Sequence, residues 1–237
     1  MAEEPTAAST SSTSATEPAR CCTSRRVALF DSAALAALLG VATTTTTTIP
    51  NGAAWAAYID PSTDMPKITA RAYLDVKIGD DGGSDGKGRI VVGLFGEAMP
   101  RATENFLRLC KSNAYAGTNF YRVLSNYTIQ GGAIGDATGK TSNSESFEPD
   151  NYNIKHTIPG LVSCVRSGVG GTGGSADSRF FVNTVGDAMW ADDRYAAFGV
   201  VEPESMDFIL SKIDKVKVKP PQNRPIVDVD IVESGVL

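Results

Sequence analysis

The chain has 237 residues, of which 42% are hydrophobic and 21% charged, and its formal net charge at pH 7 is −5. This composition is typical of a globular protein and excludes a wholly disordered or fibrous chain. The acidic balance argues against a general binder of nucleic acids or of anionic membranes. Four cysteines without a C-x-x-C pair and one histidine, His156, are too few ligands for a zinc site, so we expect no metal. We interpret Cys110 and Cys164 as isolated core thiols.

The first 56 residues differ in composition from the rest of the chain. A Ser/Thr-rich stretch precedes the pair Arg25-Arg26, which is followed by an apolar run at residues 27–42 and by Ala54-Trp55-Ala56. This order is that of a charged region, a short apolar region and a cleavage site in an export signal. The apolar run is shorter than the ~20 residues of a membrane-spanning helix. We therefore expect residues 1–56 to be a targeting segment, and the mature protein to have no membrane span.

The twin arginines and the long polar stretch before them indicate the destination. Paired arginines are typical of the twin-arginine export route, and a Ser/Thr-rich stretch before them is typical of a plastid transit peptide. We expect a bipartite address that leads to the chloroplast thylakoid lumen. The acidic residues Glu3, Glu4 and Glu17 are unusual for a transit peptide. A bacterial periplasm, an uncleaved anchor and simple disorder therefore stay open as alternatives.

Two strands and a helix are predicted at the start of the folded part. Residues 72–78 and 89–95 have the pattern of strands, and the glycine-rich segment between them predicts a hairpin with a long polar loop. Pro100 is suited to the first position of a helix. Apolar residues then repeat at helical spacing, namely Ala102, Phe106, Leu109 and Cys110.

The second half of the chain is rich in strand patterns. A second helix is predicted at about residues 204–212, where Met206, Ile209, Leu210 and Ile213 share a face. Because the helices do not alternate strictly with the strands, the pattern argues against a doubly wound α/β sheet and favours an antiparallel barrel with helical plugs. The further strand candidates are residues 119–124, 127–130, 161–165, 179–184, 196–201 and 226–231.

Short motifs between Arg71 and Leu237 resemble those of the cyclophilin family, in the family's order. They are Glu104-Asn105-Phe106, Phe120-Tyr121-Arg122-Val123, Gln130-Gly131-Gly132, Lys155-His156-Thr157-Ile158-Pro159-Gly160, Ser178-Arg179-Phe180-Phe181, Trp190 and Phe198-Gly199. The resemblance implies a mainly β fold: a closed eight-stranded antiparallel β-barrel capped by two α-helices, formed by one domain at residues 57–237. It also implies peptidyl-prolyl cis–trans isomerase activity without a cofactor, on proline-containing segments of client proteins. We expect the protein to act as a monomer.

The resemblance further implies a catalytic arginine, Arg122. When an X-Pro bond twists, its nitrogen regains a lone pair, so a hydrogen-bond donor placed there stabilises the transition state more than the ground state. A guanidinium is a rigid, permanently charged donor. By the same resemblance Gln130 binds the peptide backbone, Phe181 forms the floor of the proline pocket and Trp190 its edge. The other substrate-binding positions are Tyr127, Thr128, Val165, Arg166, Ala191 and Tyr195.

Simpler structural roles for these residues stay open at this stage. Arg122 is also compatible with an ion pair on a strand, and Gln130 with a side chain bonded to neighbouring backbone. Phe181 and Trp190 are also compatible with ordinary packing.

Several positions depart from the family pattern. Thr128 replaces a methionine and Ala191 a leucine, so we expect the pocket to lose apolar wall. Arg166 and Arg179 replace uncharged residues, and we expect two added cations near the groove. Tyr127 and Tyr195 replace a phenylalanine and a histidine. Two functions follow from this pattern: an isomerase that is weak or narrow in substrate, or a non-catalytic binding and assembly factor.

Overall fold

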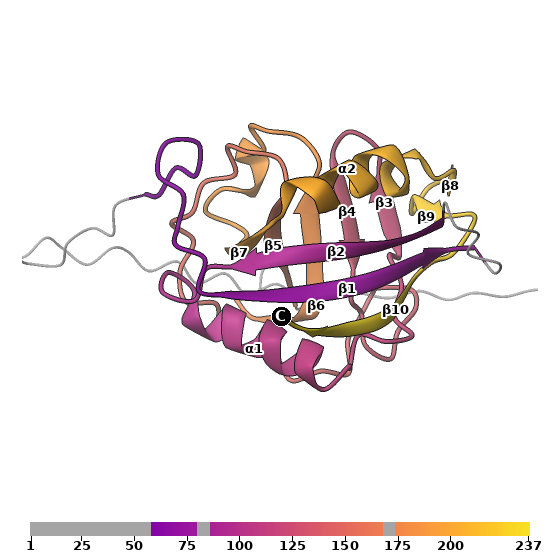
Figure 1. Cartoon of the computed structure of the whole chain (residues 1–237), viewed down its shortest axis with the longest axis horizontal. Coiled ribbons are helices and arrows are strands. Elements are labelled where there is room, and N and C mark those ends of the chain that lie inside the picture. The colour runs from indigo at the N-terminus through magenta and orange to yellow at the C-terminus, as the bar shows by residue number, and fades with distance from the viewer. Residues whose placement is uncertain (1–57, 80–85, 168–173) are drawn as a thin grey trace, which may run out of the picture. The chain divides into compact units, whose positions relative to one another are not determined.

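A strongly curled, eight-stranded antiparallel sheet forms the centre of the structure, with helices on two opposite sides of it (Figure 1). The helices are α1 (Pro100–Lys111) and α2 (Pro203–Ser211). In spatial order the strands are β10 (Val229–Val236), β1 (Ala70–Ile78), β2 (Lys87–Leu94), β7 (Ala197–Val201), β5 (Leu161–Arg166), β6 (Ala176–Asn183), β4 (Thr128–Gly131) and β3 (Arg122–Leu124). A small hairpin of β8 (Val218–Lys219) and β9 (Arg224–Pro225) lies outside this sheet.

This computed structural model describes residues 58–79, 86–167 and 174–237. The expected targeting segment at residues 1–56 lies outside the described residues, so its boundary with the folded domain stays a prediction. Within the described ranges, no helix is both long enough and apolar enough to cross a membrane.

The mainly antiparallel β fold with two helices is confirmed, but the expected closure of the barrel is not. The edge strands β3 and β10 do not pair with each other. The segment before β3 bonds to β10 instead, through the bridge between Asn119 and Asp230 and through backbone hydrogen bonds of Gly117 and Thr118 with Ile231 (2.8 Å each) and of Phe120 with Val229 (2.8 Å). Most of residues 112–118 are turns, including Asn113 with φ 54° and Gly117 with φ 80°. The contact is therefore limited to a few bonds next to these turns, and no strand ladder between β3 and β10 closes the sheet.

The predicted helices match the structure closely, whereas the last strand begins later than expected. α1 begins at Pro100, and the carboxylate of Asp150, from a distant loop, accepts bonds from the free backbone N–H groups of Arg101 (3.0 Å) and Ala102 (3.3 Å). Residues 226–228 connect β9 to β10 and are exposed, so β10 starts at Val229.

The core lies between the curled sheet and the two helices. Alternate residues of β1 point into it, and Phe106 of α1 and Ile209 of α2 are 2% and 0% exposed. Cys110 and Cys164 are buried free thiols, which confirms their interpretation as core residues. Burial raises the pKa of Cys110 to about 12 and that of Cys164 further, so neither is a reactive thiolate at neutral pH.

Candidate active site

Strand register places the three central site residues in one row across the sheet. Arg122 of β3 faces Gln130 of β4, and Gln130 faces Phe181 of β6. Their neighbours Ile129 and Val182 point the other way, into the core, at 0% and 2% exposure. Side chains alternate between the two faces of a strand. Arg122, Gln130 and Phe181 therefore share the face of the sheet that lies opposite the core.

The polar end of this row is free to bind a ligand. Among the residues that the structure describes, none forms a hydrogen bond or an ion pair with the Arg122 guanidinium or the Gln130 amide. Both side chains are half-buried and line a cleft of about 380 Å³. Arg122 therefore has no structural ion pair, and Gln130 no backbone partner, within the described part of the chain.

The apolar end of the row is covered by aromatic rings. Phe181 is 2% exposed. The ring centroids of Tyr195 and Trp190 lie 5.1 Å and 5.7 Å from that of Phe181, and Tyr127 stacks on Trp190 at 4.8 Å. The predicted pocket residues thus come together, but their rings pack on one another over the floor on which a proline is expected to rest.

The small residues Thr128 and Ala191 are not open to solvent. Both are 0% exposed. Two buried polar atoms, Thr128 Oγ1 and Trp190 Nε1, have no hydrogen-bond partner among the residues that the structure describes. One indole N–H and one hydroxyl are therefore buried in this region without a bond to any described residue.

Of the two arginines that depart from the family pattern, Arg179 differs from the expectation. Arg179 does not present its charge to the groove, because its side chain is 8% exposed and its Nη2 lies 2.6 Å from Asp177 Oδ2. Arg166 and Val165 are half-buried at the end of β5, where the pairing with β6 shifts register. Arg166 also has an interaction partner. The expectation of two free cations is therefore wrong for Arg179, which is neutralised by a neighbour on its own strand.

A buried polar network of His156, Asp192 and Ser163 lies next to Phe181. The His156 ring lies nearly parallel to the Phe181 ring, with 14° between the planes and 6.3 Å between the centroids. Its Nδ1 lies 3.0 Å from Asp192 Oδ1 and its Nε2 2.8 Å from Ser163 Oγ. A neutral imidazole with its proton on Nδ1 satisfies both, by donating to Asp192 and accepting from Ser163. Ser163 is 0% exposed, so this Ser–His–Asp arrangement has no access to a substrate.

His156 is the single histidine of the chain, which gives a direct test of this network. Desolvation lowers its pKa, an effect opposed by the bond to Asp192 and the charge of that carboxylate. Because the folded-state pKa lies below the unfolded value, this stabilisation is complete above about pH 6.5 and falls as the pH drops through the folded-state pKa. We expect the one imidazole NMR resonance to titrate with a midpoint below 6.5. A midpoint above 6.5 would contradict the buried neutral ring.

The sequence matches the family model of cyclophilin-type peptidyl-prolyl cis-trans isomerases over residues 73–236. The chain belongs to this family. It is 35% identical to peptidyl-prolyl cis-trans isomerase D of Saccharomyces cerevisiae over 185 residues, which cover 75% of this chain and 77% of the relative. Isomerase B of the same yeast is 30% identical over 179 residues (73% and 82%). The isomerase CYP21-1 of Arabidopsis thaliana is 37% identical over 150 residues (57% and 62%).

Two supporting groups were not singled out from the sequence as site residues. Ser163 and Asp192 hold His156 under Phe181, yet a serine on a strand and an aspartate in a loop carry no local signal of that contact. The Asp177–Arg179 ion pair could have been predicted from the sequence, because residues two apart on a strand share one face.

Proposed function

We propose that this chain catalyses cis–trans isomerisation of X-Pro bonds and that Arg122 is its catalytic residue. The observation that carries this proposal is a guanidinium with no partner among the described residues, in the same row as Gln130 and Phe181. A guanidinium without an ion pair can bind a substrate directly, whereas a paired one must first break its ion pair. Relatives named as peptidyl-prolyl cis-trans isomerases, at 30–37% identity, support the same activity.

The chemistry needs no nucleophile and no cofactor. Amide resonance imposes a barrier of roughly 20 kcal/mol on rotation about the peptide bond. As the bond twists, the nitrogen becomes a hydrogen-bond acceptor, and the N–H groups of Arg122 donate to it. Gln130, one strand away, holds the peptide backbone while the bond rotates. The assay that tests this measures the rate of cis–trans exchange in an X-Pro tetrapeptide with and without the protein.

Access to Phe181 requires the aromatic rings to move. In the structure, Tyr195 and Trp190 lie over the ring that a proline is proposed to contact. Replacing Tyr195 with Ala is therefore expected to raise kcat/KM for small X-Pro peptides several-fold, since the floor is uncovered without a ring displacement. NMR exchange rates with a tetrapeptide measure this change.

The matched control is Tyr195→Phe, which keeps the ring and removes only the hydroxyl. We expect it to behave like the unmodified protein. A Tyr195→Ala variant that is slower than Tyr195→Phe would show that the ring helps to bind substrate rather than cover the pocket.

The covered pocket also supports a second candidate function. A groove that stays closed to proline would still offer Arg122, Gln130 and the exposed Tyr127 (39%) to a partner without catalysis. The protein would then be a binding or assembly factor. Isomerase activity that depends on Arg122 distinguishes the two functions. For either one, we propose that the protein acts as a monomer on proline-containing segments of its clients.

We also propose that the protein works in the thylakoid lumen, with a bacterial periplasm as the alternative. The support is the order of Arg25-Arg26, the short apolar run and Ala54-Trp55-Ala56, all of which precede the family match at residue 73. The mature N-terminus is expected within a few residues of Ala57. Changing both arginines to lysine is expected to block import. N-terminal sequencing of the native protein that finds Met1 or Ala2 would refute this proposal.

A further inference from the structure

The cleft beside Arg122 is a cationic site formed by three parts of the chain. Arg122 and Gln130 come from the sheet, and Thr138 and Lys140 come from the loop that follows β4. Pro221 and Gln222, from the turn between β8 and β9, form the other wall. Among the described residues that line this cleft, two are cationic and none is acidic.

The Lys140 loop is held in place by three sets of contacts. Asp136 accepts hydrogen bonds from the backbone N–H groups of Thr138 (2.8 Å) and Thr141 (2.9 Å). Gly139 has φ 73° and lies directly against the Tyr121 ring, where a Cβ atom would collide. These contacts fix the backbone on either side of Lys140 at the rim of the cleft.

The third contact is made by the buried arginine. Arg179 Nη1 donates to the carbonyl oxygens of Gly139 (3.0 Å) and Lys140 (2.8 Å), while its Nε and Nη2 bind Asp177. Arg179, one of the residues that depart from the family pattern, therefore does not add a charge to the groove. It anchors the loop that carries Lys140, and so acts as a positioning residue.

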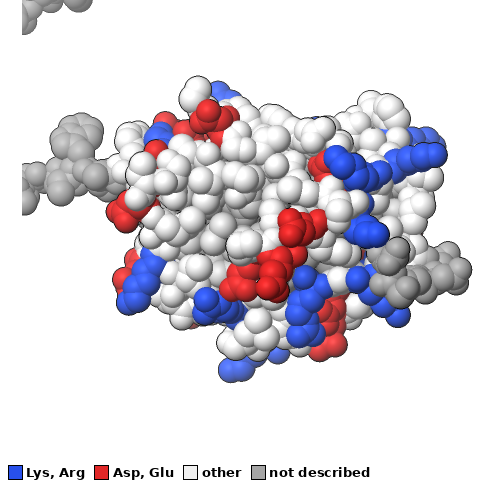
Figure 2. Space-filling view, turned by 45° about the horizontal axis from the view of Figure 1, so that its top comes forward, with Lys and Arg blue, Asp and Glu red and all other residues white. Residues whose placement is uncertain are grey.

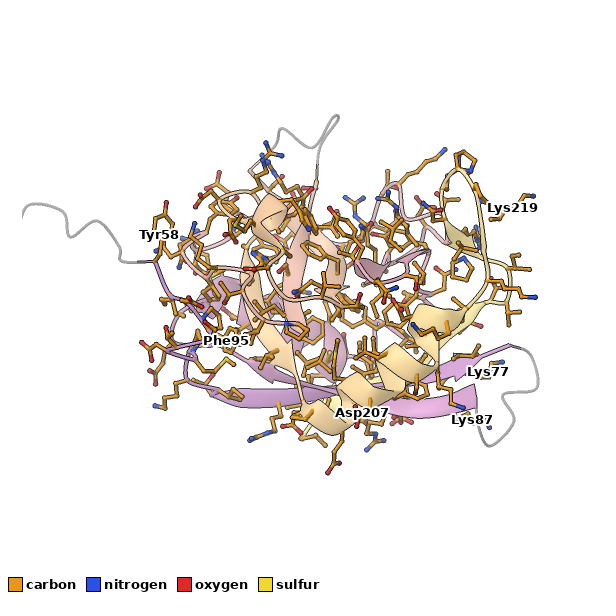
Figure 3. The ribbon with its side chains drawn as sticks, turned by 90° about the horizontal axis from the view of Figure 1, so that it is seen from above. Tyr58, Lys77, Lys87, Phe95, Asp207 and Lys219 are labelled. Carbon is orange, nitrogen blue, oxygen red and sulfur yellow. The ribbon has the colours of Figure 1, made fainter. Side chains whose placement is uncertain are left out.

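The Lys140 side chain is exposed and, within the described ranges, has no carboxylate partner. Asp136 lies in the same loop, but its carboxylate is used by Thr138 and Thr141, and these hydrogen bonds lower its pKa. The β8–β9 hairpin beyond the opposite wall carries Lys219 and Arg224, which are paired in register, and Arg224 lies 4.0 Å from the Asp228 carboxylate. Figure 2 shows Lys and Arg gathered at the end of the molecule where Figure 1 labels β8 and β9, and Figure 3 places Lys219 there.

We propose that this cleft binds an aspartate or glutamate side chain of the client, close to the proline, with Lys140 as the residue that determines this specificity. The carboxylate lies beside Lys140 while Arg122 acts on the X-Pro bond. This inference rests on the proposed isomerase function, since it places the proline at Arg122. A chain of net charge −5 thereby presents a local cationic site to acidic segments.

The test uses the full chain and pairs of proline-containing peptides that carry Glu or Gln at each of the two positions on either side of the X-Pro bond. NMR measures both peptide binding and cis–trans exchange. At one position, kcat/KM is expected to be about fivefold higher for the Glu peptide than for the Gln peptide at low ionic strength, since an exposed ion pair is worth no more than this. The ratio is expected to fall toward one in high salt.

Lys140→Met is expected to bring the Glu-to-Gln ratio to about one. The matched control is Lys111→Met, which removes an exposed lysine at the end of α1 and is expected to keep the ratio. A ratio of one at every position, or a ratio that Lys140→Met does not change, would overturn the inference while leaving Arg122-dependent isomerisation intact. If no peptide is isomerised, the proposed function fails, and the binding ratio of the Glu and Gln peptides still decides the role of Lys140.

Discussion

Replacing Arg122 with Ala is expected to lower kcat/KM for X-Pro peptides by about 100-fold or more, because removing one donor that acts on the transition state has effects of that size. Stability should change little. Arg122 is half-buried on a short strand at the edge of the sheet, and its guanidinium has no ion pair with any described residue to lose. Exchange spectroscopy of a peptide gives the rate, and thermal unfolding confirms the fold.

Two controls separate charge from geometry in this experiment. Arg122→Lys keeps the positive charge but loses the rigid fork of donors, so it is expected to recover only a small part of the rate. Arg101→Ala removes an exposed arginine near the start of α1 and is expected to have no effect. A rate that Arg122→Ala leaves unchanged, in protein free of contaminating isomerases, would remove the catalytic proposal and favour the binding factor.

Local patterns were sufficient to predict the helices and the core side of the sheet. Pro100 and the apolar repeat around Phe106 predicted α1 with its observed start, and Ile209 lies in the core as its helical spacing indicated. Both signals depend on neighbours within a few residues along the chain. The open edge between β3 and β10 had no such signal, because it depends on pairing between segments that are about 110 residues apart.

The sequence predicted which residues of the candidate site lie together, but not how their side chains pack. The motifs correctly grouped Arg122, Gln130 and Phe181, which the register of three strands brings into one row. The rings of Trp190 and Tyr195 lie over Phe181 through tertiary packing, and a residue-by-residue comparison with a family does not contain that information. The comparison also does not contain the burial of Thr128 and Ala191, which are both 0% exposed.

We expect stability to depend strongly on the buried ion pair of Arg179 and Asp177. From the sequence, Arg179 was expected to be an added cation near the groove. Arg179 and Asp177 are 8% and 5% exposed, and Asp177 also accepts a bond from the Arg179 backbone N–H (2.8 Å). Arg179→Met is expected to lower the free energy of unfolding by about 3–5 kcal/mol, because it leaves a buried carboxylate without its partner. The carbonyl oxygens of Gly139 and Lys140 lose their donor as well. Denaturant-induced unfolding measures the loss.

The cost comes from the unpaired charge more than from the lost attraction, and a second substitution tests this. Adding Asp177→Asn to Arg179→Met removes that charge, so the double variant is expected to recover part of the stability. The matched control is Arg71→Met, which breaks an ion pair of the same length (2.6 Å) with Glu202 at 54% and 35% exposure. Solvent screens that pair, so we expect a loss below about 1 kcal/mol. If Arg179→Met costs no more than Arg71→Met, then the buried pair does not hold the Lys140 loop against the sheet.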